Sequence, residues 1–522
     1  MGKQYVLGVD FGTTGTKSIV FDIEGNPVGE GSVETPLSFP RPGYAVIDPD
    51  IFTERTYQAT KTAIEKSGIN PNDIVGVSFS NLCAGLVPID KEGNYLYPII
   101  PWNDTRSIEM FDCVRKCMAD DGITDLDDFK RTGYSLQSIT GLPKMLWLQK
   151  KEPEVYHKTY KFGNCQAVLT KAYTGKHFVD DQNCITFSKL SDCRTLQYIP
   201  ELCDRYGVDY EKLADVKPTS TFVGEVPSNV AMQTGLAEGT PVYMGAGDVM
   251  CATVGAGVSE DGVAAVVIGT GGNVNTYSSK PMFHPEGKFA LHGSPAGGWH
   301  LMGSLSAAAS SLTWFTDTFC QLEKAYAKLT GQSVYPLITA MAEKSPVGAR
   351  GCMYNAWLAG ADCPYFNGNA RGTFTGLTFS HTKNDIARSV LEGVSYDLHN
   401  IIEVCQEALQ LRFHLLRILG GAAKSSFWTQ MQADVNNMPV ETVECEETSA
   451  LGAALFAAVG AKVFSSIPEG IKHMVKIKRR FEPNPETFEP YKKMYELYKL
   501  TYEDMSKRIF PAQADFQYSY VK

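Results

Sequence analysis

A strand, a turn rich in glycine and threonine, and a second strand occur twice along this chain, and this repeat constrains the fold more than any other feature. Residues 5–21 hold an apolar run that ends at Asp10, then the turn, then a second apolar run. Residues 262–277 repeat the pattern around Thr270-Gly271-Gly272. A chain of 522 residues is also too long for one core of ordinary size. The repeat therefore predicts two similar domains, which we place at 1–258 and 259–522, with their turns facing one another across a central cleft.

The chain opens as an antiparallel meander rather than as strand, loop and helix. Glu24-Gly25-Asn26-Pro27 interrupts the pattern, and a third β-rich stretch begins at Val28. Residues 51–66 are predicted as a helix that stops at Gly68, and residues 74–80 as a buried strand. No G-x-x-x-x-G-K-[ST] occurs, which excludes a P-loop, and no G-x-G-x-x-G follows a first strand, which disfavours a dinucleotide-binding fold.

The charge balance argues against a nucleic-acid or anionic-membrane partner. A formal net charge of −10 offers no basic excess to neutralise phosphates, so a small-molecule partner fits better. No stretch of about 18 apolar residues occurs, and the first residues enter a strand pattern directly, so a cytoplasmic protein is expected. The 13 cysteines form no C-x-x-C pair, and we expect them to be reduced thiols, most of them buried.

The first turn has the composition of a phosphate-binding loop. Glycine allows backbone N–H groups to approach a phosphate, hydroxyls donate to its oxygens, and lysine adds a positive charge. Asp10, at the end of the strand, could hold the water shell of Mg²⁺. An ordinary hairpin turn with a surface lysine is the alternative. The candidate phosphate contacts are Gly12, Thr13, Thr14 and Lys17 in this turn, and Gly269 and Thr270 in the second.

A third glycine turn, residues 419–426, follows the apolar run 415–419 and precedes a predicted helix over 427–435. A flat glycine turn can pack against an adenine, and the helix would bring its N-terminus to the nucleotide. A tight turn packed for steric reasons explains the same letters. Near the C-terminus, residues 491–508 are predicted as an amphipathic helix that packs on the second domain or on a partner.

Asp248 is the candidate general base. It follows a strand that runs into the small residues Gly245-Ala246-Gly247, which leaves one carboxylate at the end of a glycine-rich approach. Transfer of a phosphoryl group to an alcohol needs a carboxylate that orients the hydroxyl and accepts its proton. A capping aspartate at a helix start is the alternative.

An aromatic ring, an amide, a carboxylate and a guanidinium lie together in Trp102-Asn103-Asp104-Thr105-Arg106. Such a group suits stacking on a sugar face and fixing its hydroxyls. It is equally compatible with a polar turn under a core tryptophan.

Together these segments resemble the FGGY carbohydrate kinases, and the match runs over nearly the whole chain. The resemblance rests on the following segments: Gly8-Val9-Asp10-Phe11-Gly12-Thr13-Thr14, Trp102-Asn103-Asp104-Thr105-Arg106, Gly141-Leu142-Pro143-Lys144-Met145-Leu146-Trp147, Gly245-Ala246-Gly247-Asp248, Gly269-Thr270, Ala370-Arg371-Gly372 through Gly376-Leu377, Glu392-Gly393, and Gly420-Gly421-Ala422-Ala423-Lys424-Ser425.

The resemblance implies two α/β domains of the ribonuclease-H-like fold, within the actin–hexokinase–Hsp70 superfamily. It implies sugar bound mainly by the first domain, ATP by the second with Mg²⁺, and closure that excludes water. It makes Gly421, Ala422 and Ser425 nucleotide contacts and Asp248 the base. Many relatives form homodimers, so a homodimer is a further expectation.

The sugar pocket departs from the xylulokinase pattern. Asn81-Leu82-Cys83-Ala84-Gly85 stands where that subfamily typically has G-Q-M-H-G, and Val249 follows Asp248 where Asn or Gln is usual. An apolar side chain cannot hydrogen-bond a hydroxyl, so the substrate is expected to differ in configuration or to lack a group. The expected sugar contacts are Cys83, Ala84, Trp102, Asn103, Asp104 and Asp248.

Phosphorylation of a small sugar or polyol is therefore the predicted activity, with a pentulose such as xylulose as first candidate. L-xylulose, erythritol and the autoinducer-2 signal are alternatives. Two other classes of function are considered. One is a nucleotide switch of the actin–Hsp70 kind, and the other is a sugar-binding protein that needs no ATP.

Overall fold

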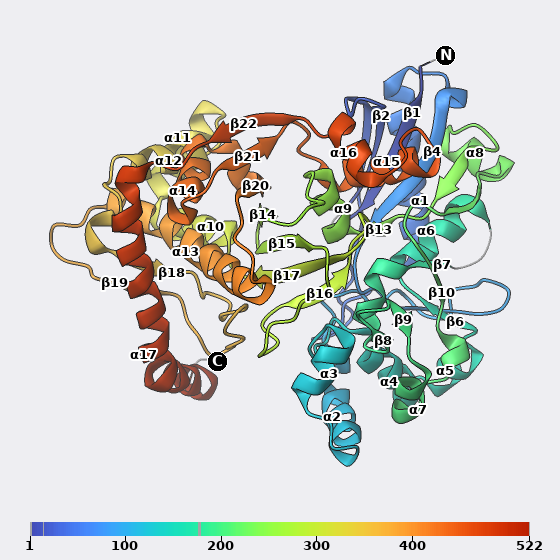
Figure 1. Ribbon diagram of the computed structural model, residues 1–522, viewed down its shortest axis with the longest axis horizontal. Coiled ribbons are helices and arrows are strands. Elements are labelled where there is room, and N and C mark those ends of the chain that lie inside the picture. Colours follow the sequence, from blue (N-terminus) through green and yellow to red (C-terminus); the bar gives the residue numbers. More distant parts are fainter. Residues whose placement is uncertain (1–2, 14, 176–178, 521–522) are drawn as a thin grey trace.

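The computed structural model describes residues 3–13, 15–175 and 179–520. Two halves lie side by side, each around a mixed sheet of seven strands (Figure 1). In the first sheet the strands lie in the order β11-β12-β4-β1-β2-β3, and β13 also pairs with β4. Its strands are β1 (Tyr5–Phe11), β2 (Gly15–Asp22), β3 (Pro27–Glu34), β4 (Ile74–Asn81), β11 (Phe222–Glu225), β12 (Pro241–Tyr243) and β13 (Ala246–Gly247).

The second sheet has the order β16-β17-β15-β14-β20-β21-β22. Its strands are β14 (Val263–Ile268), β15 (Gly272–Ser278), β16 (Ala290–Gly293), β17 (Trp299–Leu305), β20 (Leu415–Leu419), β21 (Val440–Val443) and β22 (Ile477–Phe481).

The two sheets share one topology. β1, β2 and β3 form an antiparallel meander, with β4 parallel to β1 and β12 parallel to β4. β14, β15 and β17 repeat the meander, with β20 parallel to β14 and β21 parallel to β20. This order is that of the ribonuclease-H-like fold, so the duplication expected from the two hairpins is confirmed.

Local sequence signals explain the first helix, α1 (Pro49–Ser67). The Asp48 side chain accepts hydrogen bonds from the N–H groups of Asp50 and Ile51, which caps the N-terminus. Gly68 ends the helix with φ 62°, a left-handed conformation that suits glycine. The predicted helix and its stop are confirmed.

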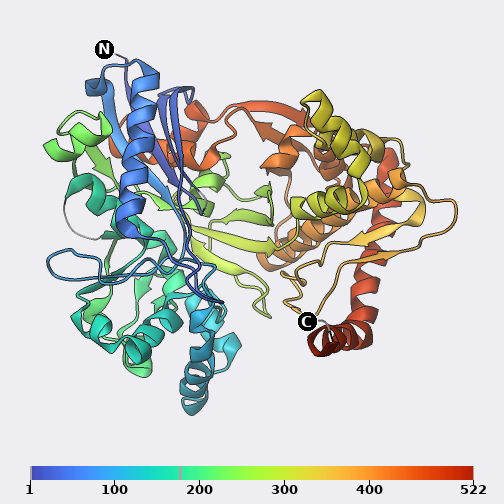
Figure 2. The same cartoon turned by 180° about the vertical axis from the view of Figure 1, so that it is seen from behind.

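The first sheet is buried on both faces. Leu7 and Val9 point toward α1, which covers one face (Figure 2). Val6 and Ile19 point to the opposite face, where they pack in one cluster with Leu451. A β-carbon at Gly8 would lie 2.0 Å from the Ala450 carbonyl oxygen, so the backbones of β1 and α15 (Thr448–Gly460) are in close contact.

This packing crosses the order of the chain. Helix α15 comes from the second half of the sequence, yet it lies on strands β1 and β4 of the first sheet (Figure 1). It also packs against α9 (Asp248–Gly255), which follows β13. The two halves are therefore joined by a shared apolar layer rather than only by the connection between them.

The last helix, α17 (Phe488–Tyr520), is longer than the predicted 491–508 and continues through Pro511. Phe510 is fully buried and its ring lies 5.7 Å from that of Trp357, so core packing holds the helix beyond the proline. Tyr491 and Tyr498 are buried in the same cluster. The helix therefore packs on the second half.

Every helix in the described part of the chain is too short or too polar to span a bilayer. The remaining helices complete the two halves. These helices are α2 (Phe111–Asp120), α3 (Asp125–Thr132), α4 (Gly141–Lys151), α5 (Pro153–Lys158), α6 (Cys165–Thr174), α7 (Pro200–Tyr206), α8 (Ser228–Thr234), α10 (Ala309–Phe319), α11 (Gln321–Thr330), α12 (Tyr335–Glu343), α13 (Lys383–Leu409), α14 (Ser426–Asn436) and α16 (Ile467–Met474).

Candidate active site

The carboxyl ends of β1, β4 and β13 bring Asp10 close to the segment that leads to Asp248. Asp10 lies opposite Ser80 in the β1–β4 pairing, and Ala246 lies opposite the same serine from the other side. The Ser80 hydroxyl donates to Asp10 Oδ1 over 2.6 Å. Parallel strands end at one edge of a sheet, so this topology gathers the acidic groups at that edge.

Asp10 carries an unusual charge environment. The pKa of its carboxyl is raised to about 7: burial raises it most and the Asp248 and Glu447 carboxylates add to the rise, whereas the Ser80 hydrogen bond and Lys17 lower it. Lys17 itself forms an ion pair with Glu447, which precedes α15. Three carboxylates and one ammonium thus meet where the two halves join.

Asp248 is the first residue of α9 and is half-buried. Its Oδ1 accepts hydrogen bonds from the Cys83 thiol at 3.1 Å and from the Val249 N–H at 2.9 Å. Burial raises the pKa of this carboxyl above its ordinary value. Ala84, next to Cys83, has φ 60°, so the chain turns sharply beside the candidate base.

Sulfur atoms crowd the approach to Asp248. Cys83 Sγ lies 3.9 Å from Cys184 Sγ. A β-carbon at Gly247 would lie 2.3 Å from Cys83 Sγ and 2.6 Å from Cys184 Sγ, so only glycine fits before the base. Burial contributes to raising the pKa of Cys83 to about 11, which keeps the thiol protonated near neutrality.

Aromatic rings from both halves adjoin this pocket. Tyr134 packs in one apolar cluster with Cys83 and Ala84. The centroid of its ring lies 5.1 Å from that of the Phe187 ring. Phe187 stacks at 4.4 Å on His292, which belongs to β16 of the second sheet. The second half therefore contributes to the surroundings of the candidate sugar pocket.

The first glycine turn is tied to the tryptophan segment. The Trp102 indole N–H donates to Thr13 Oγ1 over 3.1 Å. The Gly12 N–H donates to the Gly15 carbonyl at 3.0 Å, which closes the turn. Thr14 lies outside the described residues.

The second and third turns are in direct contact. Gly269 N–H donates to the Gly271 carbonyl at 3.0 Å, as in the first turn, and the Ala308 and Ser310 N–H groups donate to the Thr270 carbonyl. Gly420 has φ 81°, and a β-carbon there would lie 2.7 Å from the Ile268 carbonyl oxygen. The glycine in the third turn thus permits contact with the strand end of the second.

A cavity of ≈ 590 Å³ opens beside the third turn, a size suited to a small ligand. Gly421 is exposed at its wall, whereas the Ala422 side chain is buried in the core. Ser425 caps α14 by accepting from the Trp428 N–H. The cavity is lined among others by Gly420, Gly421, Lys424, Glu446 and Glu447.

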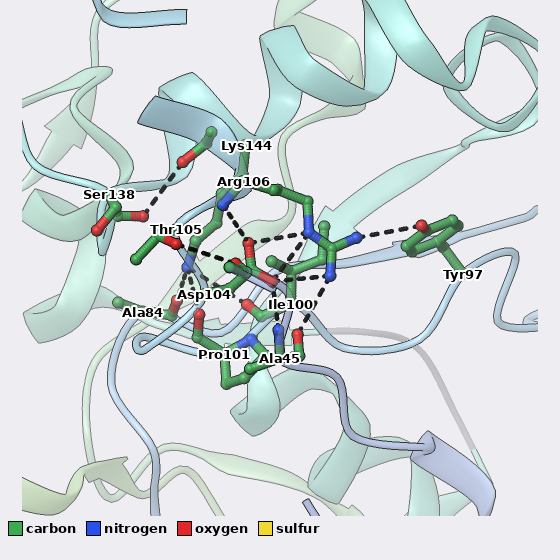
Figure 3. A network of polar contacts seen from close by, with 12 residues as sticks. Ala45, Ala84, Tyr97, Ile100, Pro101, Asp104, Thr105, Arg106, Ser138 and Lys144 are labelled. Carbon is green, nitrogen blue, oxygen red and sulfur yellow. Dashed lines mark hydrogen bonds and ion pairs between the residues drawn. The ribbon is translucent and has the colours of Figure 1, made fainter. Parts of the chain in front are cut away.

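The tryptophan segment divides into exposed and buried parts. Trp102 is 44% exposed, and the Asn103 amide oxygen is buried without a hydrogen-bond partner in the described chain. Asp104 is fully buried, and both its oxygens accept from the Arg106 guanidinium while Oδ2 also accepts from the Ala45 N–H (Figure 3). Asp104 is therefore occupied by protein donors.

Sequence reasoning missed several residues at this site. Ser80 lies inside an apolar strand and Tyr134 between helices, so no local signal marks them. Glu447 reaches Lys17 across 430 positions. The sequence signal that could have marked Glu447 is its place directly before the apolar helix 448–460.

The comparisons with known proteins agree with this architecture. The pattern of the FGGY family of carbohydrate kinases, N-terminal domain, matches residues 5–255, and that of the C-terminal domain matches residues 264–461. The chain belongs to the FGGY family of carbohydrate kinases. This FGGY kinase is a phosphotransferase that acts on a sugar hydroxyl, and the family uses ATP as phosphate donor.

Individual relatives carry different substrate names. A xylulose kinase from Staphylococcus epidermidis is 33% identical to this FGGY kinase over 499 residues, covering 93% of this chain and 94% of that relative. Crystal structures of a gluconate kinase and a xylulose kinase from Lactobacillus acidophilus each match with TM-score 0.87 at 23% identity, covering 97% of this chain and 99% of theirs. The shared fold thus does not select the sugar.

Proposed function

We propose that this FGGY kinase transfers the γ-phosphoryl group of ATP to a hydroxyl of a small sugar, with Asp248 as the general base and a pentulose such as xylulose as the first candidate. The observation that carries the proposal is the position of Asp248 at the carboxyl edge of the first sheet, beside the Cys83–Ala84 turn. Its raised pKa makes the carboxylate a better proton acceptor than an exposed aspartate.

Three turns supply the proposed nucleotide contacts. The first contributes Gly12, Thr13 and Lys17, and the second contributes Gly269 and Thr270. In the third, Gly421 faces the cavity, Ser425 adds a hydroxyl, and Ala422 could contribute only backbone because its side chain lies in the core. Thr14 remains a prediction outside the described residues.

The acidic cluster fits Mg²⁺, which prefers oxygen ligands. The Asp248 and Glu447 carboxylates both raise the pKa of Asp10, and the Lys17 ammonium, which lowers it, is already paired with Glu447. We assign Asp10 to this ion. When bound, Mg²⁺ would neutralise charge on the phosphate oxygens.

The sugar is proposed to lie against Cys83, Ala84, Trp102 and Asn103, in the domain of residues 1–258. Trp102 offers a partly exposed ring, and the unpaired amide oxygen of Asn103 can accept from a hydroxyl. The pocket lacks a polar side chain at Ala84, which favours a substrate with few hydroxyls at that point. Closure of residues 259–522 onto this domain would exclude water during transfer.

A coupled ADP-release assay with Mg·ATP tests the proposal across xylulose, L-xylulose, gluconate, erythritol and the autoinducer-2 signal. We expect one of these to stimulate turnover by the parent, and Asp248→Ala to reduce kcat by about 10²–10⁴-fold while still binding ATP. Turnover of ATP indifferent to every sugar and to the substitution would overturn the proposal and favour a nucleotide switch.

A further inference from the structure

The ammonium of Lys144, on α4, is fully buried, and its hydrogen-bond partners among the described residues are four backbone carbonyls. Its Nζ lies 2.8 Å from the carbonyl oxygen of Ala84, 3.0 Å from that of Pro101, 3.2 Å from that of Ile139 and 3.3 Å from that of Ile100. Figure 3 shows the ammonium between these segments. A single side chain thus joins three stretches of chain that are distant in sequence.

No carboxylate in the described chain forms an ion pair with Lys144. The carboxylate that acts on it electrostatically, Asp104, is already bound by Arg106. Burial lowers the pKa of Lys144 to about 7, so the charged form is costly at this place. An apolar side chain would fill the same volume without that cost, which indicates that the ammonium is retained for the geometry it imposes.

The shortest of the four hydrogen bonds of Lys144 goes to the carbonyl of Ala84, a residue with a strained backbone. Ala84 has φ 60°, a left-handed conformation that alanine rarely adopts. Lys144 holds the carbonyl of this residue, and the preceding residue, Cys83, donates to Asp248. The ammonium therefore fixes the turn from which the thiol reaches the base.

The Pro101 bond acts on the second sugar segment. Pro101 immediately precedes Trp102, whose indole N–H donates to Thr13 of the first glycine turn. Because one ammonium holds both carbonyls, Ala84 and Trp102 keep a fixed separation. A sugar that contacts both segments would depend on that separation.

We propose that Lys144 is a positioning residue for the sugar, which fixes the Cys83–Ala84 turn and the Trp102 segment relative to one another without touching the substrate. The inference rests on the proposed function, because it requires that these two segments contact the sugar. It makes Lys144 a determinant of sugar KM and gives it no part in ATP binding.

Lys144→Met tests the inference, since methionine keeps most of the stem and removes the ammonium. The probe is whichever compound of the panel above (xylulose, L-xylulose, gluconate, erythritol or the autoinducer-2 signal) the parent turns over. We expect sugar KM to rise at least about tenfold, kcat to change less than about threefold, and ATP KM to stay constant. Lys161→Met is the matched control, because Lys161 Nζ also donates to a carbonyl, that of Leu213 at 2.8 Å, but holds neither sugar segment.

A double-mutant cycle separates positioning from general stability. Ala84→Gly relieves the left-handed strain, so we expect it to lower sugar KM in the Lys144→Met background by at least about threefold and to have a smaller effect in the parent. Additive effects would overturn the inference, as would an unchanged sugar KM in Lys144→Met or losses equal to those of Lys161→Met. If Lys144→Met does not fold, Lys144→Gln carries the same readouts.

The two proposals fail differently. If no sugar stimulates the parent, the proposed function is wrong. If the parent phosphorylates a sugar and Lys144→Met matches it in sugar KM, only the role of Lys144 is wrong.

Discussion

The Cys83 thiol donates a hydrogen bond to the carboxylate of Asp248, with Sγ 3.1 Å from Oδ1. Since the pKa of Cys83 is raised to about 11, the thiol stays protonated and remains a donor at neutral pH. A donor to a carboxylate stabilises its ionised form and so opposes the effect of burial on Asp248. The sulfur at this position thereby adjusts the proposed base.

Cys83→Ala should raise the pKa of Asp248, because the carboxylate loses that donor. The pH below which kcat falls should then move upward by about 0.5–1 unit. The pH–rate profile measures the shift, and Cys113→Ala, which removes an exposed thiol, should leave it in place. An identical profile for all three proteins would show that the thiol has no effect on the base.

Asp10→Asn should change how stability depends on pH. In the folded protein burial raises the pKa of Asp10 to about 7 from 3.8, so the folded state binds the proton more tightly than the unfolded state. This group's stabilising contribution is complete below pH 3.8 and is lost as pH rises to about 7. The variant lacks that loss, so its free energy of unfolding relative to the parent should grow over this range, by about 4 kcal/mol at most.

Urea unfolding from pH 4 to pH 8 measures this difference. Asp204→Asn, at an exposed aspartate, serves as control and should give a constant difference. A constant difference for Asp10→Asn as well would mean that Asp10 ionises normally in the folded protein.

Asp104→Asn should destabilise the fold rather than weaken sugar binding selectively. The pair with Arg106 is fully buried, and loss of the carboxylate leaves that guanidinium uncompensated. We expect the free energy of unfolding to fall by about 3–5 kcal/mol. Asp121→Asn, which breaks a half-exposed pair with Arg205, should cost at most about 1 kcal/mol.

The same variant decides the predicted sugar contact at Asp104. If stability is unchanged and sugar KM rises, the carboxylate binds the substrate as the resemblance implies. Denaturant titration and steady-state kinetics on the folded variant distinguish these outcomes.

Gly452→Ala should force α15 away from α9. The added β-carbon would lie 2.1 Å from the Cys251 carbonyl oxygen, which is backbone and cannot rotate aside. We expect the free energy of unfolding to fall by about 1–3 kcal/mol. Gly368→Ala, where no atom lies within 4 Å of the new carbon, is the control and should change stability little. Equal stability for both variants would contradict the close crossing.

Local signals predicted the elements that depend on local physics. The hairpin around Gly12 and the glycine that ends α1 follow from turn and capping preferences. The duplication followed from finding the hairpin twice, and the ribonuclease-H-like fold class from the resemblance to the FGGY carbohydrate kinases. The motif residues Asp10 and Asp248 were likewise visible as carboxylates at strand ends.

The remainder depends on contacts that no local pattern encodes. The Lys17–Glu447 pair joins positions 430 residues apart, and Lys144 finds its carbonyl partners in three separate segments. Asp104 has the residue type of a sugar ligand, yet it is buried against Ala45, 59 positions away, whose N–H donates to its Oδ2. Such partners are set by packing, which sequence spacing does not reveal.

The position of α15 has a consequence for synthesis on the ribosome. Strand β12 ends at Tyr243, whereas α15 begins at Thr448, so the helix emerges on the order of 10–40 s after the sheet that it covers. Throughout that interval the face formed by Val6 and Ile19 lacks the part of its cover that Leu451 and its neighbours on α15 supply. A chain truncated before residue 448 would therefore leave part of that apolar face exposed to water.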